Sequence, residues 1–215
     1  STTGDSDFNV GIGTNALTAL TTGDNNIAIG YAAGDAMTDN LQNVVIGSSA
    51  FTTADSGEAD NVSIGFESMK YMNNAGSDNN VAIGTGALTG GTGQLSGCIA
   101  IGSLALDATS GNPLTGTIAI GHQALTTLTS GIKSTAIGYK AGAEISTGGN
   151  NTLIGYEAML NADGGEGQNV VIGTSAGYNI DNDSSDNNVI VGMEAGYGGS
   201  GALAGCVAIG RDAMK

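Results

Sequence analysis

Few side chains in this sequence could carry out catalysis, and they lie far apart along the chain. Acid–base catalysis uses an imidazole or paired carboxylates, and the chain has a single histidine, His122. The acidic residues nearest to a pair that could cleave a glycosidic bond are Glu58 and Asp60, with Glu166 further along. Carboxylates in turns are ordinarily solvated, and isolated serines lack a histidine partner. We therefore expect a protein that is not an enzyme.

Metal binding is the other chemistry to consider. The two cysteines, Cys98 and Cys206, form no Cys/His cluster with zinc spacing. Asp24, Asp78 and Asp186 each stand six residues before a repeated glycine, so stacked repeats could bring their oxygen atoms together around Ca²⁺. The nonapeptide motif of calcium-binding rolls is absent. We expect no cofactor, and Ca²⁺ bound by these turns stays open as an alternative.

A repeat determines where all these side chains lie. The pattern apolar-x-Ile-Gly-x-x-Ala occurs twelve times, at intervals of 17–19 residues. Its anchor glycines are Gly13, Gly30, Gly47, Gly65, Gly84, Gly102, Gly121, Gly138, Gly155, Gly173, Gly192 and Gly210. A fixed period of this size is typical of a solenoid, in which one repeat forms one coil. The sequence predicts an all-β parallel β-solenoid, or β-roll, of 12 coils of 17–19 residues.

The short repeats are themselves arranged in a longer repeat. The spacing series that starts at Gly13 starts again at Gly121, 108 residues later. Local sequence follows the spacing, since Gly57-Glu58 matches Gly165-Glu166. We interpret the chain as a single solenoid domain over residues 1–215 with an internal duplication, at about 9–116 and 117–215.

The residues just before each glycine predict a short β-strand. The third residue before it is usually Val or Ile, and the residue directly before it is Ile or Val, so both point to one face of the strand. We predict that the latter form a ladder inside the coils: Ile12, Ile29, Ile46, Ile64, Ile83, Ile101, Ile120, Ile137, Ile154, Ile172, Val191 and Ile209.

The opposite face of the predicted strand is also apolar. The second residue before the glycine is mostly Ala, and it is larger at Val45, Leu153, Val171 and Ile190. A strand with apolar residues on both faces is typically buried on both. We therefore expect another copy of the chain to pack against these four positions.

Asparagine stands four residues before the glycine in eight repeats, from Asn9 to Asn188. Aligned amides can form hydrogen bonds along a stack, so the pattern predicts an asparagine ladder. The segments between the repeats are rich in Gly, Asp, Asn, Ser and Thr, which is typical of turns.

Charge excludes two classes of partner. The chain has 5 basic and 20 acidic residues, for a net charge of −15. Binding to phosphate groups needs clustered Lys and Arg, so we expect no nucleic acid and no anionic membrane surface as partner. No apolar run approaches ~18 residues, so we expect no membrane insertion.

The repeat resembles that of a known family. The eight residues from Asn43 to Ala50 and the eight from Asn80 to Ala87 are similar to the Asn-Val-Ala-Ile-Gly-x-x-Ala repeat of YadA-like adhesin heads. The longer period, with pieces such as Ala136 to Gly142, resembles repeats of phage tail-fibre proteins. The resemblance implies a homotrimer of left-handed parallel β-rolls. It also implies a structural segment of an extracellular fibre, on a virion appendage or a cell surface, that attaches to a host.

Two alternatives remain open, a bacterial trimeric adhesin head and a self-assembling extracellular filament. For any of the three we expect further fibre domains or further copies at both ends, and a host-surface glycan or protein as receptor. Aromatic residues follow the anchor glycine at Tyr31, Phe66, Tyr139 and Tyr156. Exposed aromatic residues are common in recognition, so these four are candidate receptor contacts, or else they cover the seam between chains. An ice-binding plane would need regular ranks of Thr, and the residues after the glycines are mixed.

Overall fold

The computed structural model describes residues 6–55, 57–91, 93–198 and 202–215. Fourteen short strands are formed in these residues: β1 (Val10–Ile12), β2 (Ile27–Ile29), β3 (Val44–Ile46), β4 (Val62–Ile64), β5 (Val81–Ile83), β6 (Leu95–Ser96), β7 (Ile99–Ile101), β8 (Leu114–Thr115), β9 (Ile118–Ile120), β10 (Thr135–Ile137), β11 (Thr152–Ile154), β12 (Val170–Ile172), β13 (Val189–Val191) and β14 (Val207–Ile209). The three residues before every anchor glycine form a strand, as the repeat predicted. The described residues contain no helix.

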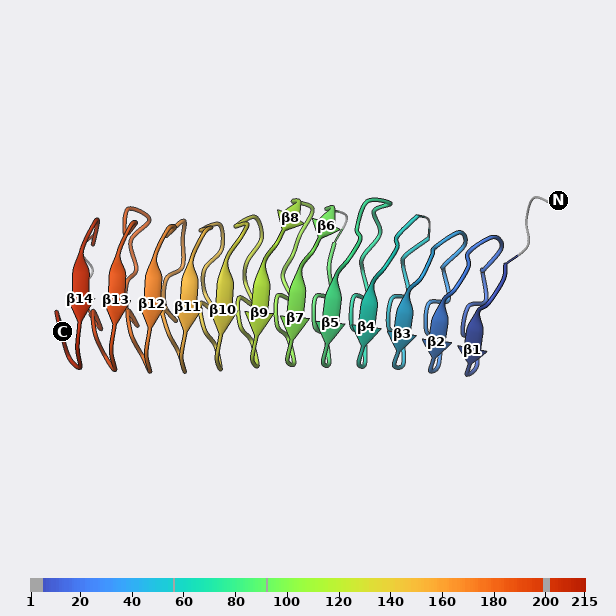
Figure 1. Cartoon of the computed structure of the whole chain (residues 1–215), viewed down its shortest axis with the longest axis horizontal. Helices are drawn as coiled ribbons and strands as arrows, with labels where there is room; N and C mark the ends of the chain where they lie inside the picture. The colour runs from blue at the N-terminus through green and yellow to red at the C-terminus, as the bar shows by residue number, and fades with distance from the viewer. Residues whose placement is uncertain (1–5, 56, 92, 199–201) are drawn as a thin grey trace.

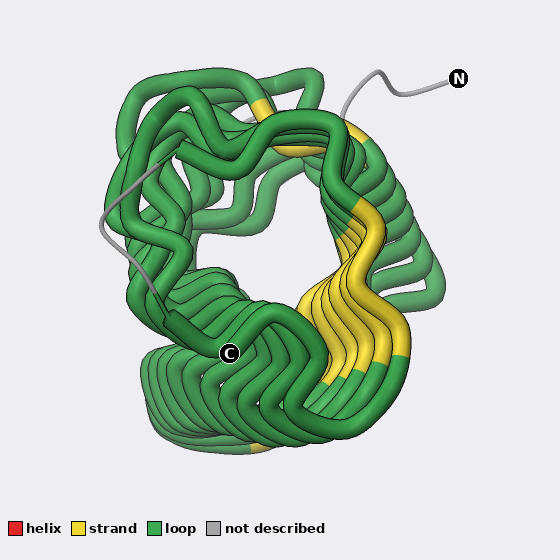
Figure 2. Tube along the Cα trace, turned by 90° about the vertical axis from the view of Figure 1, so that its left-hand side faces the viewer, coloured by secondary structure: helices red, strands yellow, loops and turns green. Residues whose placement is uncertain are grey.

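Twelve of the strands stack into one parallel sheet that runs the length of the molecule (Figure 1). Each strand pairs in register with the next, so that Ile101 of β7 lies beside Ile120 of β9 where the two sequence blocks meet. The remaining strands, β6 and β8, pair with each other beside the main sheet. Seen end-on, the turns close each coil into a tube with the sheet as one wall (Figure 2). Twelve stacked strands leave eleven connections, so the chain forms about 11 complete coils of a parallel β-solenoid, one fewer than the number of repeats.

The anchor glycines lie where successive coils touch. Their φ angles fall between +119° and +144°, a region open to glycine and not to other residues. A Cβ atom on Gly121 would lie 2.2 Å from the carbonyl oxygen of Gly138 in the next coil. Glycine is therefore needed both for its backbone conformation and for the contact between coils.

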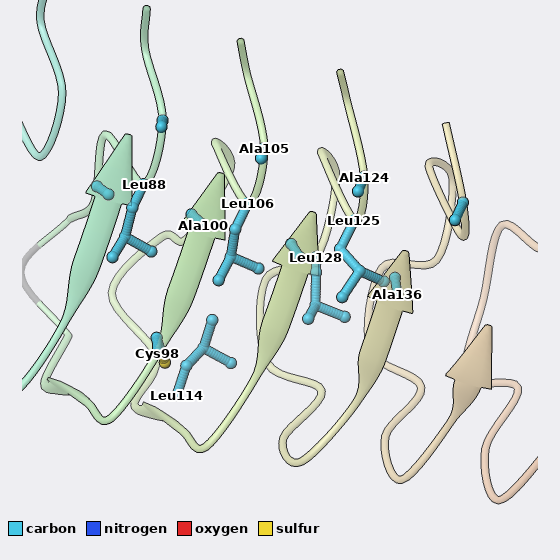
Figure 3. Packing of buried hydrophobic residues seen from close by; sticks show 14 of the residues in the cluster. Leu88, Cys98, Ala100, Ala105, Leu106, Leu114, Ala124, Leu125, Leu128 and Ala136 are labelled. Carbon is cyan, nitrogen blue, oxygen red and sulfur yellow. The ribbon is translucent and has the colours of Figure 1, made fainter. Parts of the chain in front are cut away.

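The side chains that the sheet contributes to the interior of the coils are mostly small. In the main sheet, the middle residue of each strand from β2 to β14 is buried, and the two flanking residues are partly or fully exposed. Figure 3 shows Leu88, Leu106 and Leu125 stacked beside alanines such as Ala100 and Ala124. The coil interior is thus filled by the middle strand residue together with the third and fourth residues after the glycine.

The predicted interior ladder is therefore wrong. These residues lie on the outer face of the sheet, and none of them is buried: Ile12, Ile29, Ile46, Ile64, Ile83, Ile101, Ile120, Ile137, Ile154, Ile172, Val191 and Ile209. The physical reason is volume. Most of the narrow coils already hold a Leu, Met or Phe from the fourth position after the glycine, which leaves room for small residues opposite it and no room for a continuous rank of Ile.

The predicted contact face is wrong as well, because the middle residues of the strands point into the coils. Val45, Leu153, Val171 and Ile190 are buried there and contribute nothing to the outer surface. A glycine nearby accommodates three of these larger residues, Leu153, Val171 and Ile190. A Cβ atom on Gly142 would lie 2.5 Å from Cδ1 of Leu153. The large side chain of Leu153 fills the space that a side chain at position 142 would otherwise occupy, so the packing density of the interior is kept.

The predicted asparagine ladder is confirmed. In each unbroken run, the amide oxygen of one Asn accepts a hydrogen bond from the backbone N–H of the Asn in the next coil, at 2.8–3.0 Å. The side-chain NH₂ donates to a carbonyl of the following turn, as Asn43 does to Glu58 at 2.9 Å. Each run ends at a cysteine, since the N–H of Cys98 donates to Asn80 and that of Cys206 to Asn188. The ladder therefore joins the start of each strand to the turn that precedes the next strand.

Candidate functional site

The sheet presents a continuous aliphatic face to the outside. We define this aliphatic face as the first and third residues of the twelve stacked strands: Val10, Ile12, Ile27, Ile29, Val44, Ile46, Val62, Ile64, Val81, Ile83, Ile99, Ile101, Ile118, Ile120, Thr135, Ile137, Thr152, Ile154, Val170, Ile172, Val189, Val191, Val207 and Ile209. All are Val or Ile except two threonines, and none is charged.

The aliphatic face is large and regular. Eleven steps of about 4.8 Å make it about 53 Å long, with two ranks of β-branched side chains along its length. Every one of these side chains is at least partly accessible in the single chain, and Ile137 is 38% exposed. Exposed apolar surface of this extent, in a molecule with a net charge of −15, makes this face the candidate functional site.

Three aromatic rings form a row beside the aliphatic face, two residues after the outer Ile of β9, β10 and β11. The rings of His122 and Tyr139 stack with centroids 5.4 Å apart, and those of Tyr139 and Tyr156 with centroids 5.2 Å apart. These separations follow from the spacing of the coils, since the three residues occupy the same position in successive repeats. The stack leaves the ring edges accessible, and half of Tyr156 is exposed.

The four predicted receptor contacts are all exposed, and the structure brings only two of them together. Tyr139 and Tyr156 belong to the stacked row, while Tyr31 and Phe66 follow β2 and β4, at the other end of the solenoid. Sequence reasoning missed a second stacked pair, Tyr178 and Tyr197, with centroids 5.2 Å apart. Their equal offset from the glycines after β12 and β13 is the signal that could have found it.

Nearby carboxylates affect the ionisation of these rings. The pKa of Tyr156 is raised, chiefly by a hydrogen bond with Glu157 that favours the neutral phenol. The pKa of Tyr178 is raised by partial burial, to which the charge of Glu157 adds. Both phenols therefore stay neutral and able to donate hydrogen bonds across the physiological range.

The aspartates predicted to stack around Ca²⁺ do not meet. Asp24, Asp78 and Asp186 precede β2, β5 and β13, so several coils separate each from the next. Each carboxylate instead accepts the backbone N–H of a residue in the preceding coil, as Asp78 does from Ala59 at 2.9 Å. These three aspartates connect neighbouring turns, and the alternative of a calcium site shared among them does not fit their positions.

The carboxylates considered for glycoside cleavage also lie apart. Glu58 and Glu166 precede β4 and β12, six coils from each other, or about 29 Å. A glycosidase needs its two carboxyl groups within about 10 Å. Asp60 is exposed in the turn before β4. Glu58 and Glu166 therefore cannot act as a pair, although both are completely buried.

Burial of Glu58 should make stability depend on pH. Loss of hydration is the main cause that raises its pKa above the ordinary value of 4.5, and a hydrogen bond from Asn40 partly opposes it. The folded chain then binds the proton more tightly than the unfolded chain. Stability is greatest below about pH 4.5 for this group and falls as the pH rises through the raised pKa.

We expect Glu58→Gln to remove this dependence. Glutamine keeps an oxygen that accepts the amide of Asn40 and carries no charge. Urea unfolding should show the variant more stable than the wild type at about pH 8 and equal to it near pH 4. The exposed neighbour Asp60→Asn is the control and should show no such difference. A wild type that gains stability relative to Glu58→Gln on raising the pH would contradict the assignment.

The described residues enclose no pocket for a small molecule. Among them there is also no helix long and apolar enough to cross a membrane. Comparison with protein-family models, curated protein sequences and solved structures finds no match. The fold and the aliphatic face therefore define this chain as a parallel β-solenoid with a long lateral surface suited to association.

Proposed function

We propose that this chain is a non-enzymatic structural segment of a homotrimeric surface fibre, in which copies pack side by side through the aliphatic face. The observation that carries the proposal is the uncharged double rank of Val and Ile along all twelve stacked strands. A partner for this face must present a complementary surface with the same period over about 53 Å. A second copy of the same solenoid meets that requirement.

Charge supports self-association through this face in particular. The chain carries a net charge of −15, so two copies repel each other over most of their surfaces. The aliphatic face lacks charge along its length and is where copies can approach at the lowest electrostatic cost. The number three comes from the resemblance of the repeat to YadA-like heads and phage tail-fibre repeats.

Within such a fibre the turns and the exposed rings face the surroundings. Strand positions are occupied by packing, so chemical variety is confined to the turns and to the residues after each glycine. We propose that these attach to a glycan or protein on a host surface, outside the cell. A phage tail fibre or related appendage is the assembly we favour. A bacterial adhesin head would use the same face and the same turns.

Strand β7 offers a direct test, because neighbouring residues point to opposite sides of the sheet. Light scattering in native buffer is expected to give about 63 kDa for the wild type, three times 21.0 kDa. Replacing Ile101 and Ile120 with glutamate places charges on the aliphatic face and should give a folded monomer. The buried middle residue of β7, Ala100, should behave differently, since Ala100→Glu should prevent folding instead.

The control adds the same two charges away from the aliphatic face. Ser110 and Asn112 lie exposed in the turn between β7 and β9, and their replacement with glutamate should leave the mass unchanged. A wild-type monomer near 21 kDa, or an Ile101/Ile120 variant that keeps the wild-type mass, would rule out association through this face.

A further inference from the structure

Three carboxylates meet in the turns that precede β12 and β13. Asp163 and Glu166 belong to the first turn and Asp181 to the second, one coil further on. One oxygen of each lies within 4.8 Å of an oxygen of the other two. Asp163 and Asp181 are exposed, and Glu166 is completely buried beneath them. The three therefore form a cup of oxygen atoms that opens to solvent.

The buried carboxylate at the base of the cup has an oxygen without a partner. Oε2 of Glu166 accepts the backbone N–H of Gly164 at 3.1 Å. Oε1 of Glu166 is buried and has no hydrogen-bond partner among the described residues. An ionised carboxylate in that state is costly unless a positive charge compensates it.

The two sequence blocks differ at this point in an informative way. In the first block the equivalent residue, Glu58, accepts a hydrogen bond from the side chain of Asn40 at 2.6 Å, and its other oxygen is likewise unpartnered. In the second block the position of Asn40 is Gly148, so the neutral partner is missing. A Cβ atom there would lie 1.9 Å from the carbonyl oxygen of Glu166, which leaves no room for a side chain.

The second block has also gained negative charge around its buried glutamate. Asp181 and Asp183 stand where the first block has Asn73 and Ala75. Oδ1 of Asp183 accepts the N–H of Gly165 at 3.1 Å, which holds the turn against its neighbour. The like charges of Asp163, Glu166 and Asp181 repel one another at these separations, and a bound cation would relieve that repulsion.

We propose that Asp163, Glu166 and Asp181 bind a Ca²⁺ ion between these two coils. All three ligands are carboxylate oxygens, which hard divalent cations prefer. Oxygen atoms on opposite sides of Ca²⁺ lie about 4.6–5.2 Å apart, whereas those around Mg²⁺ lie about 4.2 Å apart. The three oxygens lie within 4.8 Å of one another, and the flexible coordination of Ca²⁺ suits ligands from two separate turns better than the near-octahedral geometry that Mg²⁺ demands. The ion would join two successive coils without depending on the oligomeric state of the chain.

Calorimetric titration of the EDTA-treated full chain with CaCl₂ tests this site. We expect saturable binding of one ion per chain and a rise in melting temperature in millimolar CaCl₂. The double variant Asp163→Asn/Asp181→Asn should lose both effects. Its two side chains are exposed, so its calcium-free melting temperature should stay at or above that of the wild type. MgCl₂ should give a smaller effect than CaCl₂.

The two glutamates provide a matched pair of variants. Glu166→Gln should raise the calcium-free melting temperature, because it removes a buried charge, and should abolish the calcium effect. Glu58→Gln changes the equivalent residue six coils away and should keep the full calcium effect. Absence of binding by the wild type would overturn the proposal, as would full binding by the Asp163/Asp181 variant or an equal loss in Glu58→Gln. Equal binding of Mg²⁺ would overturn the assignment to Ca²⁺.

Discussion

Replacement of Gly121 with alanine is expected to destabilise the solenoid by about 2–6 kcal/mol. An L-residue at φ +134° is strained by about 1–3 kcal/mol. The new Cβ atom would also lie 2.2 Å from the carbonyl oxygen of Gly138, and an overpacked contact of this kind costs about 1–3 kcal/mol. Urea unfolding followed by circular dichroism would measure the loss.

Two other glycines separate the causes. Gly210 has a φ of +119° and no atom within 4 Å of an added Cβ, so Gly210→Ala should show the strain without the clash. Gly116 has a φ of +63° at the position that is Asn25 and Asn79 in other coils, so Gly116→Asn should be nearly neutral. If Gly121→Ala costs no more than Gly116→Asn, then close contact between coils does not require glycine.

The consequence should extend beyond one residue because coils touch only their neighbours. In a solenoid, stability is close to a sum of coil terms and terms for the contacts between coils. Weakening the contact between β9 and β10 should therefore divide the stack into two parts that unfold at different urea concentrations. A single transition shifted to lower urea would instead indicate that the twelve strands unfold as one unit.

The sequence was sufficient to predict the strands and the stacking of the coils. The interval between glycines sets the length of a coil, and β-branched residues two apart define a strand whatever its neighbours are. The asparagine ladder could be predicted as well, since Asn43 and Asn61 occupy the same position in successive coils and in-register stacking places equal positions together.

The alternation of side chains along a strand does not show which face of the strand points into the coil. It identifies residues that share a face, and both faces of β9 are apolar, with Ile118 and Ile120 on one and Ala119 on the other. The volume available inside a narrow coil decides which of the two faces points inward. The pairing of large Leu153 with Gly142 was the usable signal, because exchange of volume is expected only between residues that touch.

The carboxylate cup was missed for a different reason. Asp163 and Asp181 lie 18 residues apart, which is one coil, so their proximity follows from the repeat itself. Asp24, Asp78 and Asp186 share one offset from the anchor glycine, whereas Asp163 and Asp181 stand at two different offsets and do not form a visible column in the repeat. Burial of Glu166 depends on the path of its turn, and a turn rich in glycine leaves that path undetermined in the sequence.

The asparagine ladder should be the other large source of stability. Oδ1 of Asn169 accepts the backbone and side-chain N–H groups of Asn188, both at 3.0 Å, and its NH₂ donates to the carbonyl of Ser185 at 2.8 Å. Asn169→Ala would leave the buried N–H of Asn188 and the carbonyl of Ser185 unpaired. Each orphaned group costs about 1–3 kcal/mol, so we expect a loss of about 2–6 kcal/mol in urea unfolding.

A serine at the same position provides the matched control. Ser134 occupies this ladder position in another coil, where its Oγ accepts the N–H of Asn151 at 3.2 Å. Asn169→Ser should therefore recover the acceptor for Asn188 and lose less than the alanine variant. Equal losses would show that the alanine variant acts through the cavity it leaves. If neither variant lost stability, water would be the hydrogen-bond partner of the Asn188 N–H and the Ser185 carbonyl in place of the amide. The ladder would then be dispensable, because it is needed only where a buried backbone group would otherwise have no partner.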